Sequence, residues 1–398
     1  MGVPFNHCRP EYAESSIRKG LISGRLVEDD AVLIRSFCHE MQATVGITVG
    51  RTNKIVFTLV SLRRFIGPFA ENTIQDLHSG IIQLRAAPSS KGKPFKANTI
   101  ADHIAILKQF YTWLVENGHT RIPAGKLAAM ITPARDRMTK TAGDLLTPEE
   151  VAAMVKACMR DMDRALLITL YEGGFRIGEM GALRWGDITF DTYGCVVNTS
   201  FKTKKPRYVR LIMAVEHLGR WRESYPGEPE GDALVFVNRY GEPLNHGQVL
   251  QQFRRIAARA GIRKNITPHL FRHSRITHLI REGASESVIK MLMWGSVNSR
   301  MLDTYLHLVG ADVDREIFRL YNIDQETQKG ARRLEPRLCA HCQTLNGPTT
   351  RYCTTCLRPL EEQAAAEMDD LLEFVRKRPE YQQILQAMVQ DYERITRG

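Results

Sequence analysis

The chain has 398 residues, of which 43% are hydrophobic and 25% charged, and its formal net charge at pH 7 is +11. This length predicts two or three domains, each large enough to bury a core of its own. The last segment, Glu361–Gly398, carries nine acidic and five basic residues, and its net −4 leaves +15 for residues 1–360. A basic body of this kind favours a polyanionic partner, most often nucleic acid, over a basic protein without such a partner. Without an apolar run of eighteen residues or an N-terminal apolar signal core, the sequence predicts a cytoplasmic protein with no membrane segment.

The first third of the chain is predicted to be an arm followed by a helical domain. Residues 1–27 show no sustained periodicity and are expected to form an arm or loop. From residue 28 to 132 apolar residues recur at helical spacing, and the clearest helix runs from Asn98 or Thr99 to Asn117. Residues 133–146 lose this periodicity and are expected to link two domains.

A second domain, residues 147–330, is predicted to begin sharply. Thr147 is placed as an N-cap, Pro148 as the first helical residue and Glu150 as the third member of a capping box. The domain is expected to be helical except around residues 187–213, where two β-rich runs flank the polar segment Lys202–Arg207. Such a pattern predicts a β-hairpin.

The C-terminal part of the chain contains a cysteine cluster and then a helical tail. Cys339 and Cys342 form one C-x-x-C pair, and after ten residues Cys353 and Cys356 form another. Two such pairs predict one structural Zn²⁺ per chain, held by four thiolates in residues 331–360, with disulfides as the less favoured alternative. Residues 361–398 form an acidic amphipathic helix that is expected to pack on a protein.

The segment Gly173-Gly174-Phe-Arg176, with Glu179 three residues on, predicts a turn that opens into a helix. Arg176 then lies at the helix start, where backbone N–H groups also favour an anion. Taken alone, the two residues favour an ordinary surface ion pair between Arg176 and Glu179.

Two more basic groups follow along the chain. Lys202 enters the predicted hairpin turn, and a basic turn of this kind, taken alone, is typical of a solvated tip or of a contact with a backbone phosphate. Thr267 and Pro268 begin a predicted helix whose first turn places His269 and Arg272 on one face. A histidine and an arginine that converge at a helix N-terminus are typical of phosphate binding, although a capped surface helix has the same pattern.

Tyr305 completes a set that suits phosphodiester chemistry. Two arginines grip a phosphate bidentately, a phenol attacks as a covalent nucleophile, and a lysine protonates the departing hydroxyl. The sequence has no Walker-type phosphate loop and no acidic trio placed for two metal ions. The pattern therefore predicts no cofactor or metal in the chemistry itself.

These motifs resemble the tyrosine recombinase, or phage-type integrase, family over about residues 28–312. The family's R-x-x-E box with a following L-x-W-x-D, its hairpin lysine, its H-x-x-R and its final tyrosine followed by x-His occur here in the family's order. They stand at Arg176/Glu179, Leu183, Trp185, Asp187, Lys202, His269/Arg272 and Tyr305/His307. The usual Gly-His nine residues before the tyrosine is here Gly295-Ser296, after Trp294. This variation resembles archaeal integrases and leaves either Ser296 or Trp294 for the sixth catalytic position.

The resemblance implies a mainly α fold with a small β-hairpin. It implies a helical core-binding domain at 28–132 and an α+β catalytic domain at 147–330, ahead of the zinc module and the helical tail. The catalytic residues would be Arg176, Lys202, His269, Arg272, Ser296 and Tyr305.

By the same resemblance, duplex DNA attachment sites are the partners, and four protomers act on synapsed DNA at the nucleoid, whereas the free protein is a monomer or dimer. The DNA would be cut and rejoined through a 3′-phosphotyrosine. The alternatives are a type IB topoisomerase and a DNA-binding regulator on a recombinase scaffold.

Overall fold

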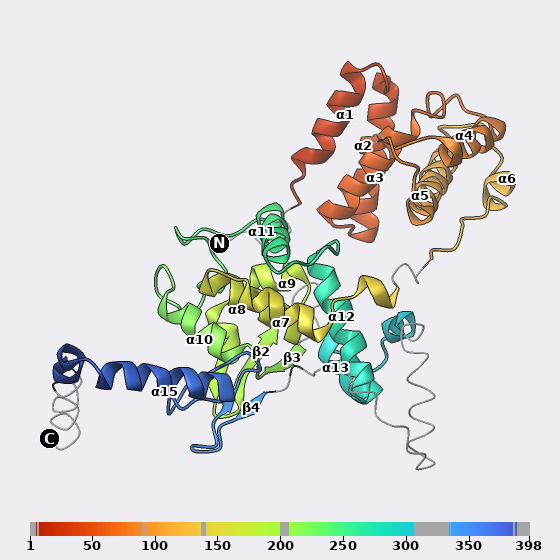
Figure 1. Cartoon of the computed structure of the whole chain (residues 1–398). Coiled ribbons are helices and arrows are strands. Elements are labelled where there is room, and N and C mark those ends of the chain that lie inside the picture. Colours follow the sequence, from red (N-terminus) through yellow and green to blue (C-terminus); the bar gives the residue numbers. More distant parts are fainter. Residues whose placement is uncertain are drawn as a thin grey trace, which may run out of the picture. The chain divides into compact units, whose positions relative to one another are not determined.

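The computed structural model describes residues 5, 8–89, 92–136, 141–199, 207–305, 334, 336–384 and 387 (Figure 1). The chain folds into two compact units. The first is His7–Thr139, and the second is Lys140–Gly398 together with Met1–Asn6. The boundary falls inside the segment 133–146.

Helices make up the regular elements of the described part of the first unit. Its α-helices are α1 (Glu11–Ile22), α2 (Glu28–Val45), α3 (Val49–Leu62), α4 (Ile74–Ala86), α5 (Ala97–Glu116) and α6 (Ala124–Ala128). The helix predicted from residue 98 or 99 to 117 is thus confirmed as α5. Its aromatic residues fill the core, where Phe110 packs edge-on against both Phe37 and Phe69 at ring-centroid distances of 5.3 and 5.0 Å.

The prediction of an arm without regular structure is wrong for residues 11–22, which form α1. Ala13, Ile17 and Gly20 lie on the buried face of this helix and pack against α3. Gly20 packs closely against Leu26, and a Cβ at this position would lie only 2.8 Å from the leucine side chain. A helix with so narrow an apolar face gives a weak periodic pattern in the sequence, and it is stabilised mainly by its packing against the rest of the unit.

In the second unit, helices surround a small antiparallel sheet. Its helices are α7 (Pro148–Lys156), α8 (Asp161–Glu172), α9 (Ile177–Ala182), α10 (Val215–Glu223), α11 (His246–Arg259), α12 (Pro268–Arg281) and α13 (Glu286–Trp294). Short 3₁₀ turns occupy Ala142–Asp144, Trp185–Asp187 and Arg300–Thr304. The predicted start of the domain is confirmed, since the Thr147 hydroxyl accepts the Glu150 N–H and the Glu150 carboxylate accepts the Thr147 N–H.

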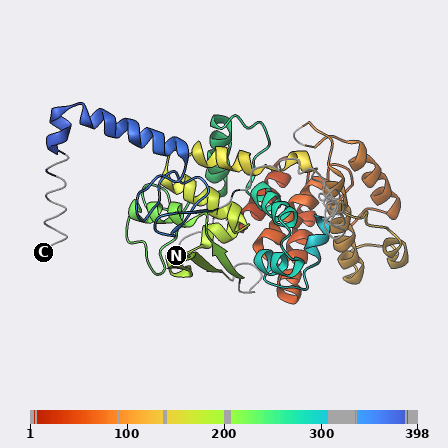
Figure 2. The same ribbon diagram turned by 60° about the horizontal axis from the view of Figure 1, so that its bottom comes forward.

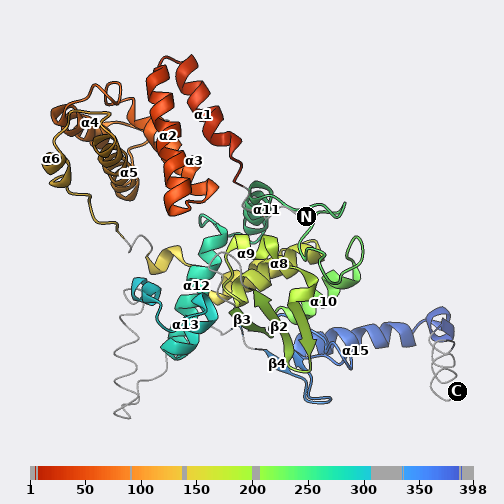
Figure 3. The same ribbon diagram turned by 180° about the vertical axis from the view of Figure 1, so that it is seen from behind.

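The sheet contains β1 (Ile188–Asp191), β2 (Gly194–Thr199) and β3 (Arg207–Leu211) in that order, which confirms the predicted hairpin and adds a strand before it. The strands lie side by side in Figure 2. Cys195 pairs with Leu211 and Val197 with Val209, and all four side chains are buried. The views in Figures 1 and 3 agree that α10 lies on one side of the sheet and α12 and α13 on the other.

Phe5 belongs to the core of this second unit, although it lies in the predicted arm. Its side chain is 1% exposed and seats against Gly181 of α9, where a Cβ would meet the Phe5 ring and backbone at under 3 Å. The Phe5 carbonyl accepts a hydrogen bond from the His246 N–H at 2.8 Å.

Two short strands, β4 (Arg337–Leu338) and β5 (Leu345–Asn346), and the helix α15 (Glu362–Arg376) follow. The cysteine segment contacts α10, where the hydroxyls of Thr350 and Thr349 hydrogen-bond to Glu216 and to His217. No helix within the described residues is long and apolar enough to cross a membrane.

His278 on α12 makes the stability of this unit depend on pH. It is buried and shares a 2.7 Å hydrogen bond with the Tyr171 hydroxyl through Nδ1. Burial, followed by the charges of Arg275 and Arg281, lowers the pKa of His278 to about 4. As the pH falls from about 6.5 to about 4, the unfolded chain binds a proton that the folded chain does not, so the free energy of unfolding must fall.

We expect this histidine to account for at most about 3 kcal/mol of that loss, and His278→Gln to remove its share of the pH slope. Urea unfolding followed by tryptophan fluorescence at several pH values between 7.5 and 4 would measure it. Equal losses of unfolding free energy in the wild type and the variant would contradict this assignment.

Candidate active site

Arg176 and Glu179 form the first part of the site, at the start of α9. Arg176 is the N-cap residue, and its N–H donates to Glu179 Oε2 while its guanidinium donates to Oε1, both at 2.8 Å. The ion pair considered from the sequence is therefore present. Its two sides differ, because the Glu179 side chain is 2% exposed and that of Arg176 is 24% exposed. Glu179 thus anchors an arginine that still reaches solvent.

The glycine turn before Arg176 is required by close packing. Gly174 has φ +54°, and a Cβ there would lie 2.4 Å from the sulfur of Met293 on α13. A larger residue would suffer both backbone strain and this clash. The turn therefore brings the end of α8 directly against α13.

Arg272 lies on the buried face of α12 near the start of this helix, and its guanidinium connects the helix to two other segments. It donates to the carbonyl oxygen of Gly174 and, at 2.7 Å, to that of Met293, and it lies over the Trp294 ring at 5.4 Å. Burial, followed by the positive charges of Arg176 and Arg207, lowers the pKa of Arg272 to about 9. The group therefore stays protonated at neutral pH, and the two bonds use two of its five N–H groups.

Two further predicted residues, His269 and Ser296, lie near helix ends. His269 is exposed on the first turn of α12, one turn before Arg272, as the sequence predicts. Ser296 is half-buried and directly follows Gly295, which ends α13 in the left-handed conformation. Trp294, the other candidate for the sixth position, contacts Arg272 and also Tyr305, whose ring centroid is 6.3 Å away.

Tyr305 follows the 3₁₀ turn Arg300–Thr304 and is only 4% exposed. Its ring packs against His273 at a centroid distance of 5.3 Å and against Trp294. Burial raises the pKa of Tyr305 to about 12, although the charges of Arg272 and Arg176 act to lower it. The phenol is thus protonated in this structure, and attack requires a proton acceptor.

The structure therefore brings Arg176, Arg272 and Tyr305 together. His269 lies on α12, the helix that carries Arg272, and Ser296 lies just after the end of α13. Lys202, Lys204 and Lys205 lie outside the described residues, as does His307. The two strands that flank the lysine-bearing segment, β2 and β3, are described and pair antiparallel.

Sequence reasoning missed Arg207, the first residue of β3. Its side chain is 2% exposed and donates to Glu179 Oε2 at 2.6 Å. A signal was available, because Arg207, Val209 and Leu211 alternate along the strand and the last two are apolar residues that point inward. An arginine at an inward position is a buried charge and therefore needs an acidic partner.

Glu172, at the end of α8, is a second missed residue. Its carboxylate accepts three backbone N–H groups, from Ile212, Met213 and Ala214, at 2.7–2.9 Å. Burial raises the pKa of this carboxyl group, and the three hydrogen bonds oppose that shift. The interaction fastens the end of β3 to α8, the helix whose glycine turn precedes Arg176.

The site carries an excess of positive charge. Burial is the main cause of the lowered pKa of Arg272, and the guanidiniums of Arg176 and Arg207 lower it further. Glu179 is the carboxylate that contacts both Arg176 and Arg207. One carboxylate against three guanidiniums leaves the cluster near +2. A bound phosphate would offset this charge in a partly desolvated place, where such an interaction is strong.

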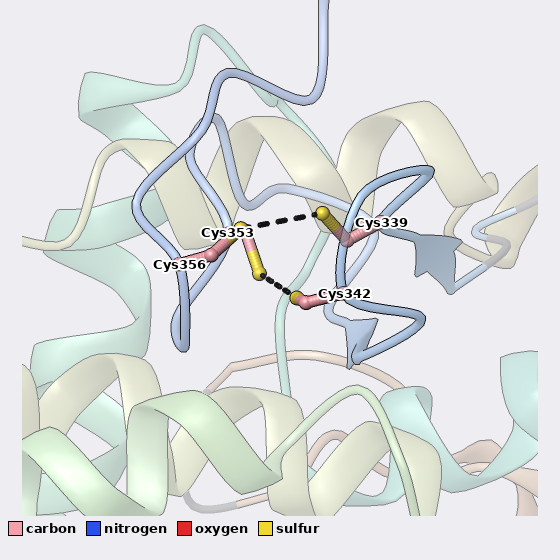
Figure 4. A group of neighbouring side chains, drawn as sticks. All are labelled: Cys339, Cys342, Cys353 and Cys356. Carbon is pink, nitrogen blue, oxygen red and sulfur yellow. Dashed lines mark hydrogen bonds between the residues drawn. The ribbon is translucent and has the colours of Figure 1, made fainter.

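The four cysteines of the C-terminal segment form a separate cluster (Figure 4). Their sulfur atoms all lie within 4.8 Å of one another. In both C-x-x-C pairs the residue after the second cysteine, Gln343 or Leu357, has φ +58°, and its N–H donates to the carbonyl of the first cysteine at 2.9 Å. Two turns of the same conformation thus present four thiols to one point, and this arrangement can hold a metal ion.

Comparisons with known proteins relate this chain to DNA recombinases. The model of the phage integrase family matches residues 144–310. The chain is 27% identical over 259 residues to tyrosine recombinase XerC of Xylella fastidiosa, a match that covers 63% of this chain and 86% of the relative. It is 32% identical over 200 residues to transposase A from transposon Tn554 of Staphylococcus aureus, covering 46% and 54% of the two chains.

The fold is similar to that of a solved lambda integrase tetramer bound to a Holliday junction. The TM-score is 0.54 at 18% sequence identity, and the match covers 69% of this chain and 76% of the other. At this identity the likeness concerns the fold.

Proposed function

The chain belongs to the tyrosine recombinase family and is a site-specific DNA recombinase, and from this premise we propose that Tyr305 is the nucleophile that cuts duplex DNA. The observation that carries the proposal is the placement of a buried phenol beside Trp294, within the field of Arg272 and Arg176. Attack by the phenol gives a 3′-phosphotyrosyl link and a free 5′-hydroxyl. The link keeps the energy of the broken bond for rejoining.

Arg176 and Arg272 are proposed to bind the non-bridging oxygens of the scissile phosphate. Negative charge grows on these oxygens as the tyrosine attacks, and donors already fixed in place stabilise it most. Both guanidiniums are fixed, one by Glu179 and the other by the carbonyls of Gly174 and Met293. These guanidiniums supply the positive charge, so the proposed chemistry uses no metal ion or cofactor.

Lys202, His269 and Ser296 are proposed to complete the site. Lys202, on the hairpin turn, would protonate the departing 5′-oxygen, and His269 would donate to the phosphate from the helix start. For the sixth position we propose that the Ser296 hydroxyl donates to the phosphate, while Trp294 holds the Arg272 guanidinium and the Tyr305 ring. This Gly-Ser variation is also the reason for proposing an archaeal-type integrase of a mobile element.

The four-cysteine module is proposed to bind one structural Zn²⁺. Four thiolates satisfy the tetrahedral preference of zinc and leave no position for a substrate, so the site is closed. Residues 331–360 are proposed as a separate module, beside a core-binding domain at 28–132 and a catalytic domain at 147–330.

The proposed substrate is a pair of duplex attachment sites, on which four protomers assemble. The basic body of the chain and the tetrameric assembly of the structurally similar lambda integrase support this proposal. The free protein would be a monomer or dimer, and we propose that it acts in the cytoplasm, at the nucleoid.

Tyr305→Phe is expected to abolish the covalent protein–DNA adduct and leave DNA affinity nearly unchanged. Phenylalanine keeps the ring packing on His273 and Trp294 and removes only the attacking oxygen. A denaturing gel with a labelled attachment site measures the adduct, and a mobility shift measures the affinity. Tyr193→Phe, at an exposed position, is the matched control and should still form the adduct. An adduct in Tyr305→Phe would place the nucleophile elsewhere.

Lys202→Ala is expected to slow cleavage by roughly two to four orders of magnitude, the usual contribution of a general acid. A substrate whose bridging 5′-oxygen is replaced by sulfur needs little protonation of its leaving group. It should restore most of the rate to Lys202→Ala and little to Arg176→Ala, whose defect is charge stabilisation. Lys204→Ala is the control and should mainly alter affinity and its salt dependence. Equal rescue of Lys202→Ala and Arg176→Ala, or no rescue of Lys202→Ala, would contradict the assigned role.

Cys353→Ser is expected to lose the zinc and to unfold the module locally, while Tyr305 still forms its adduct. A small module with little core depends on its metal for folding. Elemental analysis should find about one zinc per wild-type chain and almost none in the variant, and limited proteolysis should cut the variant within the module. Cys8→Ser, at an exposed cysteine of the first unit, should keep the metal. A wild-type protein purified without chelator and free of zinc would refute this prediction.

A further inference from the structure

The Arg207 guanidinium joins three segments of the catalytic unit. It donates to Glu179 Oε2 at 2.6 Å, to the Gly173 carbonyl at 3.1 Å, and through two nitrogens to the Leu292 carbonyl at 2.9 and 2.6 Å. It also lies over the Phe175 ring, 5.2 Å from its centroid. One side chain at the start of β3 thus connects the hairpin, the α8–α9 turn and the end of α13.

Each of these partners adjoins a residue of the proposed site. Glu179 binds the Arg176 guanidinium through its other oxygen, Oε1. Gly173 and Leu292 immediately precede Gly174 and Met293, whose carbonyls hold Arg272. The two arginines proposed to bind phosphate are therefore held by groups that are themselves fixed by Arg207.

Arg207 does not itself fit the role of a phosphate ligand. Its side chain is 2% exposed, and its Nε and both terminal nitrogens already donate to protein acceptors. The Arg176 side chain, on the opposite oxygen of the same carboxylate, is 24% exposed. The shared carboxylate therefore separates a buried arginine from one that faces solvent.

We propose that Arg207 is a positioning residue that aims Arg176 at the scissile phosphate through Glu179. This inference rests on the proposed recombinase chemistry and adds a residue to it. Without Arg207, the Glu179 carboxylate would be free to rotate toward Arg176. The Arg176 guanidinium would then shift away from the position in which it contacts the non-bridging oxygens of the phosphate. Displacements of about 1 Å in such groups cost about a hundredfold in rate.

Arg207→Lys separates this role from that of a mere buried charge. Lysine keeps the positive charge and much of the packing, but a single ammonium cannot reproduce the planar fork that reaches Glu179, Gly173 and Leu292 together. Arg210→Lys is the matched control on the same strand. Arg210 is partly exposed and pairs with Asp191, outside the site.

The experiment compares cleavage of two attachment-site duplexes, one with a normal phosphodiester and one with a neutral methylphosphonate at the scissile position. The neutral linkage develops less negative charge and so depends less on Arg176. We expect Arg207→Lys to cleave the phosphodiester about a hundredfold more slowly than wild type and the methylphosphonate with a much smaller loss. DNA affinity should stay near that of wild type, and Arg210→Lys should match wild type on both duplexes.

Equal loss on both linkages would overturn the inference, because it would mean a general structural defect. Rescue of Arg207→Lys by the 5′-sulfur substrate would also overturn it, by placing the effect in proton transfer through the hairpin. If Arg207→Lys melts below the assay temperature, Glu179→Asp, which keeps the charge but shortens the reach to both arginines, is expected to show the same selective loss. A wild-type protein that forms no Tyr305 adduct would instead contradict the proposed function.

Discussion

The arrangement of the catalytic unit depends on one buried carboxylate, that of Glu179, which is shared by Arg176 and Arg207. Bringing charges out of water costs several kcal/mol per ion, and only close pairing with further hydrogen bonds offsets this cost. Here the carboxylate receives two guanidiniums and the Arg176 N–H at 2.6–2.8 Å. Burial lowers the pKa of Arg272, and the nearby charges of Arg176 and Arg207 lower it further. The free protein therefore keeps like charges together, and the phosphate proposed to bind here would relieve their repulsion.

Two helix C-termini explain how so many guanidiniums are held with so few acids. The last carbonyls of a helix have no partner within it and carry the negative end of the helix dipole. Leu292 and Met293, in the last turn of α13, accept from Arg207 and Arg272, and Gly173 and Gly174, just after α8, accept from the same two side chains. Backbone groups thus take the place of additional carboxylates. An extra carboxylate would have neutralised the charge that a phosphate needs, whereas these partial charges fix the arginines and leave that charge in place.

The parts of this site that follow from local sequence were predictable, and the parts that depend on distant contacts were not. Thr147 as a cap, Arg176 at a helix start, His269 and Arg272 on one turn, and the paired cysteine turns are each set by a few neighbouring residues. The helix at residues 11–22 was missed because its buried face is narrow, and Phe5 was missed because its partner Gly181 is far along the chain. Arg207 stands in a strand whose inward alternation was visible, but its partners Glu179 and Leu292 lie 28 residues before it and 85 after it.

The burial of Tyr305 determines the protonation state of its phenol in the free protein. Burial raises the pKa of the phenol more than Arg272 and Arg176 lower it, so the proposed nucleophile is neutral in the free protein. A phosphate that binds these arginines weakens their pull on the phenolate, so the two cations cannot by themselves activate the tyrosine. Attack by this phenol therefore needs a proton acceptor in addition to the two cations. In the proposed mechanism, the arginines that bind the phosphate are already fixed in the free protein, while the phenol stays neutral until a proton acceptor acts on it.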